Sequence, residues 1–287
     1  MLNVISLSKK YKNSDFFSLN DVSFELNEGE IVGLIGNNGA GKTTLMKLIA
    51  KTLTPTSGKI EINHNNINEK SNSLKKVNFM IEAAFFKHIS AYDNIKYYLN
   101  INKQNASQKQ IQEVMQLVNL WHVKDKKPSH FSFGMKQRLG LAMCLASNPN
   151  VVIMDEPFVG LDPNGVLTLT KRLKLWAKEK NMAILISSHQ LNELETICDR
   201  YLYLEDGMLK KSFNKSQQNC TLIFLQDPIH TINLKSFQNT TIENNVVKTF
   251  LDGNEFNELV NTLCKNNIIK KIERYDYLRD IFKGEDK

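Results

Sequence analysis

The chain has 287 residues, enough for one large α/β domain with a small appendix or for two modest domains. Its hydrophobic fraction of 41% is ordinary for a protein with a packed core, and no apolar run approaches the roughly 20 residues that span a bilayer. The net charge of +7 is dispersed, which argues against nucleic acid as a partner, and the four scattered cysteines disfavour disulfides and zinc. The N-terminus lacks a signal-peptide pattern, so we expect a cytoplasmic protein that reaches a membrane only indirectly, through a partner.

Two kinds of strand are predicted along the chain. Alternating stretches near the N-terminus predict antiparallel strands, at residues 2–7 and 21–26. Continuous apolar stretches predict the buried strands of a parallel sheet, at residues 31–35, 151–154 and 183–186, and a further strand is predicted at residues 77–81. Helices are expected between them, at residues 42–51 and after Pro163. This alternation predicts an α/β fold with a mostly parallel core sheet and an N-terminal antiparallel β subdomain.

Two segments depart from the alternation. From about residue 90 to 147 the apolar period is helical throughout, which predicts an inserted helical subdomain. Beyond Gly207 the chain becomes rich in asparagine, with short strands, a helix at 255–264 and a last strand near 269–272. We therefore expect a large domain at residues 1–211 and a small α+β appendix at 212–287, in which nothing suggests chemistry.

Residues 36–43 read G-N-N-G-A-G-K-T and stand between a predicted strand and a predicted helix. Glycines allow the backbone to turn its N–H groups toward an anion, and the N-terminus of a helix favours negative charge. Lys42 adds a positive charge for the outer phosphates. The loop is therefore predicted to bind a nucleoside triphosphate. Its contacts are expected to be Asn37, Asn38, Gly39, Ala40, Gly41, Lys42, Thr43 and Thr44.

Two carboxylates follow the strand predicted at 151–154, and ligands bind at this end of the strands in open parallel sheets. Asp155 is predicted to hold a magnesium ion together with the hydroxyl group of Thr43. Glu156, one residue further, is predicted to polarise an attacking water molecule as a general base. His189 closes the strand predicted at 183–186 and is expected to reach the γ-phosphate or this water molecule.

The segment F-S-F-G-M-K-Q-R precedes a helix predicted from about residue 135 to 147. Ser132 and Gly134 would present a hydroxyl group and a backbone N–H at the N-terminus of that helix, which makes a second anion site. Because the chain already has one phosphate loop, this second site is predicted to serve a nucleotide held by another copy.

In this order, the motifs G-x-x-x-x-G-K-T, F-S-F-G-M, V-V-I-M-D-E-P, V-G-L-D and S-S-H resemble those of the nucleotide-binding subunits of ABC transporters. The resemblance covers roughly residues 1–210. It implies the P-loop NTPase fold, ATP as the nucleotide, a homodimer or heterodimer of such subunits, and a membrane permease on separate chains. It also implies that Ser132 and Gly134 contact ATP bound on the opposite subunit. Asp162 would communicate across the dimer, and Tyr11 would stack on adenine.

Two departures from the usual motifs of these subunits point to a particular group within the family. The usual L-S-G-G-Q signature is F-S-F-G-M here, and the position usually held by a glutamine is Glu82. Both features resemble the ATPase subunits of bacitracin- and lantibiotic-type peptide exporters, which implies resistance or immunity to peptide antibiotics at the inner face of the cell membrane. An ionised carboxylate accepts hydrogen bonds but donates none. Glu82 is therefore expected either to contact nucleotide and metal as the glutamine does or to couple to the membrane partner.

The motif set predicts an ATP-hydrolysing transport motor, with two alternatives. One is a nucleotide-gated scaffold with negligible hydrolysis, which the altered signature and Glu82 leave open. The other is an ABC-type ATPase that acts on ribosomes or DNA, which the dispersed basic residues disfavour. Steady-state turnover with and without the permease separates the motor from the scaffold.

Overall fold

The computed structural model describes residues 1–12, 14–69, 74–82, 84–103, 107–217, 219–226, 237, 240–266 and 269–276. The chain divides into two compact units, Met1–Ser212 and Phe213–Lys287. Each unit has its own cluster of buried hydrophobic side chains. None of the described helices is long and apolar enough to cross a membrane.

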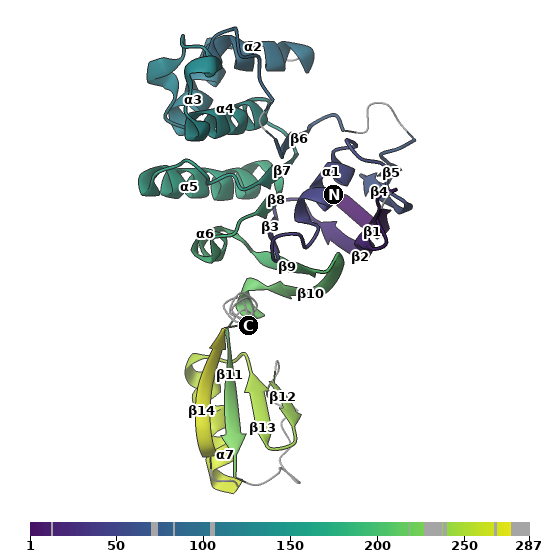
Figure 1. The fold of residues 1–287 in the computed structure, drawn as a ribbon. Coiled ribbons are helices and arrows are strands. Elements are labelled where there is room, and N and C mark those ends of the chain that lie inside the picture. Colours follow the sequence, from purple (N-terminus) through teal and green to yellow (C-terminus); the bar gives the residue numbers. More distant parts are fainter. Residues whose placement is uncertain are drawn as a thin grey trace. The chain divides into compact units, whose positions relative to one another are not determined.

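The first unit is built on a six-stranded sheet with the order β10-β9-β3-β8-β7-β6 (Figure 1). Its strands are β3 (Ile31–Ile35), β6 (Val77–Met80), β7 (Val151–Asp155), β8 (Ala183–Ser187), β9 (Arg200–Glu205) and β10 (Met208–Asn214). The five strands from β9 to β6 pair in parallel, as predicted for the core sheet. The strands β9 and β10 were not predicted; Asp206 and Gly207 join them with positive φ angles of 48° and 73°, the conformation of a tight hairpin turn.

Three helices connect these strands: α1 (Lys42–Ile49), α5 (Pro163–Lys180) and α6 (Leu191–Ile197). The helix α5 begins where the sequence predicted, because the carboxylate of Asp162 accepts a hydrogen bond from the Gly165 N–H at 2.8 Å and a proline follows it. It ends at Asn181, which is left-handed with φ 51°. The helix α1 buries Leu45, Leu48 and Ile49 in the core, the face that the sequence indicated.

A four-stranded sheet with the order β2-β1-β4-β5 forms the N-terminal subdomain. Its strands are β1 (Leu2–Lys10), β2 (Phe17–Leu26), β4 (Ser57–Ile62) and β5 (Asn65–Asn66). The strands β1 and β2 are antiparallel, as predicted, and Leu2 lies opposite Leu26. Their buried side chains join the same hydrophobic cluster as β3 and α1, so this sheet packs beside the two elements that flank the predicted phosphate loop.

The inserted helical subdomain contains α2 (Ala91–Ile101), α3 (Gln108–Leu117) and α4 (Phe133–Ala146), which Figure 1 shows gathered at one end of the first unit. Two short 3-10 helices, Trp121–Val123 and Pro128–His130, connect α3 to α4. Each of the three α-helices begins after a serine whose hydroxyl group caps its first turn, at Ser90, Ser107 and Ser132. The helix α4 begins two residues earlier than predicted, because Ser132 is its N-cap.

The second unit contains a four-stranded antiparallel sheet with the order β12-β13-β11-β14. Its elements are a 3-10 helix (Lys215–Gln217), β11 (Asn219–Leu225), β12 (Thr240–Glu243), β13 (Val246–Thr249), α7 (Gly253–Asn266) and β14 (Ile269–Asp276). The helix α7 buries Leu259 and Leu263 against Ile223, Leu225 and Val247 of the sheet. This packing gives the unit a small hydrophobic core of its own.

Candidate functional site

The loop between β3 and α1, which the sequence predicts to bind phosphate, requires glycine at two positions for steric reasons. Gly36 has φ 149°, and a Cβ atom there would lie 2.1 Å from the Leu204 carbonyl oxygen. Gly41 has φ 105°, and a Cβ atom there would lie 2.5 Å from the Ser18 carbonyl oxygen. Backbone packs against backbone at both positions, so any side chain would displace the loop.

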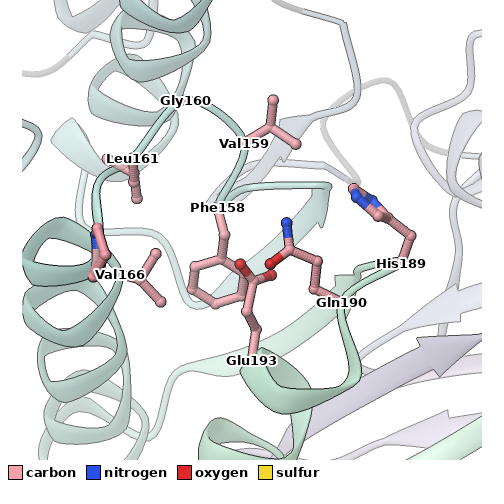
Figure 2. A pocket seen from close by; sticks show the side chains of 9 residues that line it. Phe158, Val159, Gly160, Leu161, Val166, His189, Gln190 and Glu193 are labelled. Atoms are coloured by element: carbon pink, nitrogen blue, oxygen red, sulfur yellow. The ribbon is translucent and has the colours of Figure 1, made fainter.

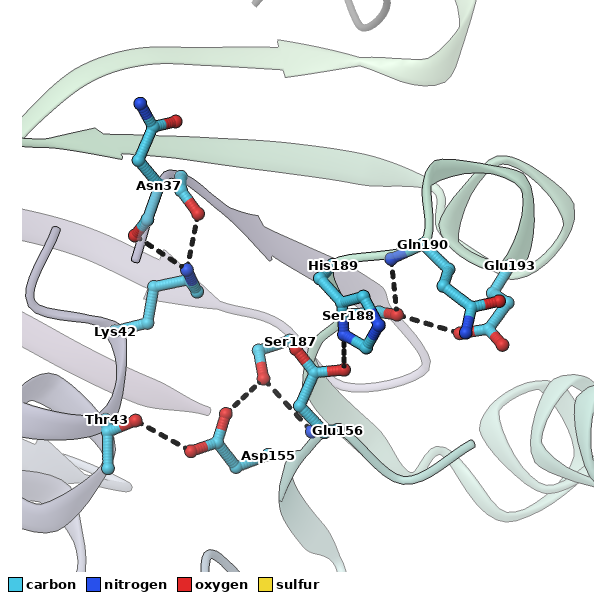
Figure 3. A network of polar contacts seen from close by, with 11 residues as sticks. Asn37, Lys42, Thr43, Asp155, Glu156, Ser187, Ser188, His189, Gln190 and Glu193 are labelled. Atoms are coloured by element: carbon cyan, nitrogen blue, oxygen red, sulfur yellow. Dashed lines mark hydrogen bonds and ion pairs between the residues drawn. The ribbon is translucent and has the colours of Figure 1, made fainter. Parts of the chain in front are cut away.

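The loop surrounds a cavity of about 300 Å³. Its lining residues are Ser18, Asn37, Asn38, Gly39, Gly41, Lys42, Thr43, Thr44, Asp155 and Glu156. Seven of the eight predicted loop contacts are therefore in the lining; the eighth, Ala40, is buried and its carbonyl oxygen accepts a hydrogen bond from the Gly207 N–H at 3.1 Å. The Lys42 ammonium group donates hydrogen bonds to the carbonyl oxygens of Gly36 and Asn37 (Figure 3). A bound phosphate would offer this cation a stronger, charged acceptor.

Asp155 lies at the end of β7 and faces the loop. Its Oδ2 accepts a hydrogen bond from the Thr43 hydroxyl group at 2.8 Å, and its Oδ1 accepts one from the Ser187 hydroxyl group (Figure 3). A carboxylate beside a hydroxyl group is an oxygen donor set of the kind that Mg²⁺ uses together with water and substrate phosphates. Within the described ranges, no group of three or more His, Cys, Asp or Glu side chains could hold a metal ion by itself. The donor set formed by Thr43 and Asp155 fits a magnesium ion.

Glu156 and His189 come together because β7 and β8 are neighbours in the sheet. The His189 Nδ1 lies 2.7 Å from the Glu156 Oε2 (Figure 3). A carboxylate oxygen accepts, so Nδ1 is the donor in this contact. Glu156 has φ 52°, a left-handed backbone conformation that is uncommon for residues other than glycine. The site therefore holds a carboxylate and an imidazole in contact beside the phosphate cavity.

A second cavity, of about 530 Å³, adjoins His189 (Figure 2). It is lined by Phe158, Val159, Gly160, Leu161, Pro163, Val166, His189, Gln190 and Glu193. The Glu193 Oε2 accepts a hydrogen bond from the Ser188 hydroxyl group at 2.7 Å. Burial raises the pKa of the Glu193 carboxyl group, and the charge of Glu156 raises it further. Carboxylates thus border both cavities, and His189, which lines the second, contacts Glu156, which lines the first.

The signature segment lies apart from the phosphate cavity of its own chain. The Ser132 hydroxyl group accepts a hydrogen bond from the Met135 N–H at 3.3 Å, and the neighbouring Phe133 side chain is 68% exposed. Gly134 lies against Gly160, where an added Cβ atom would be 2.5 Å from the Gly134 Cα. This contact joins the N-terminus of α4 to the loop that follows Glu156. Neither Ser132 nor Gly134 is among the described residues that line either cavity.

Two further predicted contacts, Asp162 and Tyr11, also lie outside the described lining of the phosphate cavity. The Asp162 carboxylate caps α5 through the Gly165 N–H. Tyr11 follows β1, is 41% exposed, and has the Lys9 ammonium group 5.4 Å from its ring centre. Their roles at a nucleotide remain predictions.

Glu82 forms an ion pair with Lys47 of α1, with 2.7 Å between Oε1 and Nζ, and its side chain is 77% exposed. The hydrogen bond and the charge of Lys47 lower the pKa of the Glu82 carboxyl group. In this arrangement the carboxylate is bound to a lysine of the helix that carries the phosphate loop. Its predicted contact with metal and nucleotide stays a prediction.

Sequence reasoning missed Ser18, Lys47 and Ser187. Ser18 reaches the phosphate cavity from β2, and no sequence signal indicates this. Lys47 is one lysine among many. Ser187 could have been found, because it is the last residue of its strand as Asp155 is of the neighbouring one, and parallel strands end at the same edge.

Comparisons with known proteins establish the family. A family model described as ABC transporter matches residues 19–159. The uncharacterized ABC transporter ATP-binding protein YcbN of Bacillus subtilis (strain 168) is 37% identical over 230 residues, which cover 78% of this chain and 74% of that protein. The chain belongs to the ABC transporter ATP-binding proteins. The resemblance drawn from its motifs is thereby confirmed, and like other ABC ATP-binding subunits it is a transport-associated ATPase.

Other ABC relatives include proteins of antibiotic transport. The bacitracin transport ATP-binding protein BcrA of Bacillus licheniformis is 36% identical over 73% of this chain and 68% of that protein. The lantibiotic transport ATP-binding protein SrtF of Streptococcus pyogenes is 34% identical over 76% of this chain and 93% of that protein. A solved structure of an ATP-binding subunit of an ABC transporter superposes with a TM-score of 0.68 and 29% identity, over 75% of this chain and 90% of that one. The predicted ABC ATPase fold is therefore confirmed.

Proposed function

We propose that this ABC ATPase drives the export of peptide antibiotics of the bacitracin or lantibiotic type and so confers resistance or immunity. Its similarity to BcrA and SrtF supports this cargo class. The observation that carries the ATPase part is the meeting of three segments at one sheet edge: the loop with Lys42 and Thr43, the carboxylates Asp155 and Glu156, and His189. A triphosphate in the 300 Å³ cavity would touch the loop and the two carboxylates, and His189 contacts one of these carboxylates, Glu156.

Each side chain has one task in hydrolysis. Lys42 turns from the loop carbonyl oxygens to the outer phosphates, where negative charge accumulates during phosphoryl transfer. Thr43 and Asp155 would hold Mg²⁺, which would neutralise phosphate charge. Glu156 accepts a proton from the attacking water molecule, and His189 holds the carboxylate of Glu156 in place while its Nε2 accepts a hydrogen bond from the water molecule or a protonated phosphate.

The working unit in this proposal is a homodimer or heterodimer of ATP-binding subunits. Ser132 and Gly134 of one subunit contact the ATP bound at Lys42 of the other, with Asp162 linking the two sites. The exposed N-terminus of α4, which is apart from its own cavity, supports this reading. Tyr11 stacks on adenine and Glu82 contacts the metal or the permease. A permease on separate chains holds the pair at the inner face of the cell membrane.

Glu156→Gln tests the motor. The amide keeps the size of the side chain but cannot take up a proton, so ATP binding remains, a stable ATP-bound dimer accumulates, and turnover falls by about 10²–10⁴-fold. Glu193→Gln is the matched control, since it makes the same change beside the neighbouring cavity and is expected to trap no dimer. Gel filtration with ATP and a phosphate-release assay report both quantities. Rapid hydrolysis by Glu156→Gln would refute the role of Glu156 as the general base. Negligible turnover by the wild-type protein, with and without the permease, would favour the scaffold alternative instead.

Cargo is tested separately in cells. A strain whose only copy carries Lys42→Ala cannot bind the triphosphate properly, so we expect it to be more sensitive to bacitracin or to a lantibiotic than the parent strain. Antibiotics that act inside the cell serve as controls. If the Lys42→Ala strain and the parent strain are equally sensitive to bacitracin and to lantibiotics, the cargo proposal is refuted and the ATPase assignment is unaffected.

A further inference from the structure

One buried hydroxyl group joins the two carboxylate-bearing residues of the hydrolysis site. Ser187 is the last residue of β8, and in the parallel register it pairs with Asp155, the last residue of β7. Its side chain is fully buried, with 0% exposure. A polar group in such a position needs hydrogen-bond partners, and Ser187 finds them on the neighbouring strand.

Ser187 uses its hydroxyl group in both directions. It donates a hydrogen bond to the Oδ1 of Asp155 and accepts one from the Glu156 N–H at 3.2 Å (Figure 3). A serine hydroxyl group can donate and accept at once. Asp155 is then held on both sides, by Ser187 at Oδ1 and by Thr43 at Oδ2. These two bonds fix the plane of the carboxylate.

The backbone of Glu156 depends on the same residue. Its N–H also lies 3.2 Å from the Ser187 carbonyl oxygen, so one N–H is shared by two oxygens of one residue. The φ angle of 52° at Glu156 is uncommon for a side-chain-bearing residue and persists only where the surroundings impose it. This conformation directs the Glu156 carboxylate to His189.

We infer that Ser187 is a positioning residue of the ATPase site, which orients Asp155 for Mg²⁺ and holds Glu156 in its left-handed conformation. The inference rests on the proposed function, because Asp155 and Glu156 have their roles there. Ser187 is not among the described residues that line the phosphate cavity, so it acts through the two carboxylate-bearing residues.

The neighbouring Ser188 is a matched control. It is 2% exposed, so its hydroxyl group is as buried as that of Ser187. Its partners are different: it donates to Glu193 and accepts from the Gln190 N–H at 3.0 Å. Removing either hydroxyl group therefore leaves a similar buried defect, while only one of them touches the residues of the hydrolysis site.

The test uses the full-length chain and a fluorescent ATP analogue, titrated with and without Mg²⁺, together with kcat, KM and the melting temperature. Ser187→Ala is expected to raise the Mg²⁺ concentration for half-maximal nucleotide binding by about 10–100-fold and to lower kcat, with little change in binding without Mg²⁺. Ser187→Thr keeps the hydroxyl group and should restore the wild-type Mg²⁺ dependence. Ser188→Ala should leave this dependence unchanged even if its melting temperature falls. If Ser187→Ala does not fold, Ser187→Cys, with a weaker donor, should shift the Mg²⁺ dependence in the same direction.

Asp155→Ala separates the two levels of the proposal. If Asp155→Ala leaves the Mg²⁺ dependence of nucleotide binding unchanged, the metal-binding role of Asp155 is refuted, and the role of Ser187 is refuted with it. If Asp155→Ala shifts the dependence but Ser187→Ala does not, only the inference about Ser187 is overturned. Equal shifts in Ser187→Ala and Ser188→Ala also overturn it, because the effect would then be one of general stability.

Discussion

Replacing Gly160 by alanine tests the contact between the signature helix and the hydrolysis site. The added Cβ atom would lie 2.5 Å from the Gly134 Cα and 3.1 Å from the Gly134 carbonyl oxygen. The first distance is about 1 Å shorter than ordinary carbon contacts of roughly 3.5–4.0 Å, and the obstacle is backbone, so the N-terminus of α4 must move by about that amount. The φ angle of 81° adds strain of about 1–2 kcal/mol for alanine.

The expected result follows from where Gly134 acts in the proposed dimer. A displacement of about 1 Å in a group that contacts the reacting phosphate can reduce turnover on the order of 10²-fold. ATP binding to the phosphate loop of the same chain should be unchanged, since Gly134 is outside its lining. Binding by the isolated subunit and phosphate release by the assembled transporter measure the two effects.

Gly253→Ala is the control for this variant. Gly253 also has a positive φ, 52°, but an added Cβ atom there meets nothing within 4 Å. It therefore loses about 1–2 kcal/mol of stability to backbone strain without displacing a neighbour. Turnover of Gly160→Ala within about twofold of wild type would refute the argument that this backbone contact positions the signature helix.

The ion pairs give two further predictions. Burial raises the pKa of the Glu30 carboxyl group, but hydrogen bonds from Arg200 and Asn27 outweigh it, so the pKa is lowered. In urea unfolding at pH 7, Arg200→Met should lower the free energy of unfolding by about 2 kcal/mol. This difference from wild type should shrink as the pH falls below 4.5, because Glu30 then loses the ionised form that Arg200 stabilises. A difference that stays constant with pH would contradict this reasoning. Lys47→Met and Glu82→Gln should change turnover non-additively, whereas Lys59→Met and Glu61→Gln, which remove an ion pair within β4, should leave turnover unchanged. Additive effects of Lys47→Met and Glu82→Gln would show that the Lys47–Glu82 contact does not matter for turnover.

The second unit shows the limit of sequence reasoning for topology. Its helix and most of its strands could be recognised, because alternation and helical period are local patterns. The order β12-β13-β11-β14, which places the first and last strands side by side, depends on pairing between distant segments. The turn at Asp206 and Gly207, by contrast, could have been predicted from the local sequence, because Asp-Gly is a common β-hairpin signal. The sequence analysis did not predict it.

By itself, the sequence determined the predicted phosphate loop, the two carboxylates at the end of β7 and the family, because each depends on residues close together in the chain. Only the tertiary structure decided what these residues touch. The parallel register of β7 and β8 brings Ser187 to Asp155 and His189 to Glu156, and the packing of the first unit pairs Glu82 with Lys47. Such contacts are set by which strands are neighbours and how far each one extends, and a single sequence carries that information only through the folded chain.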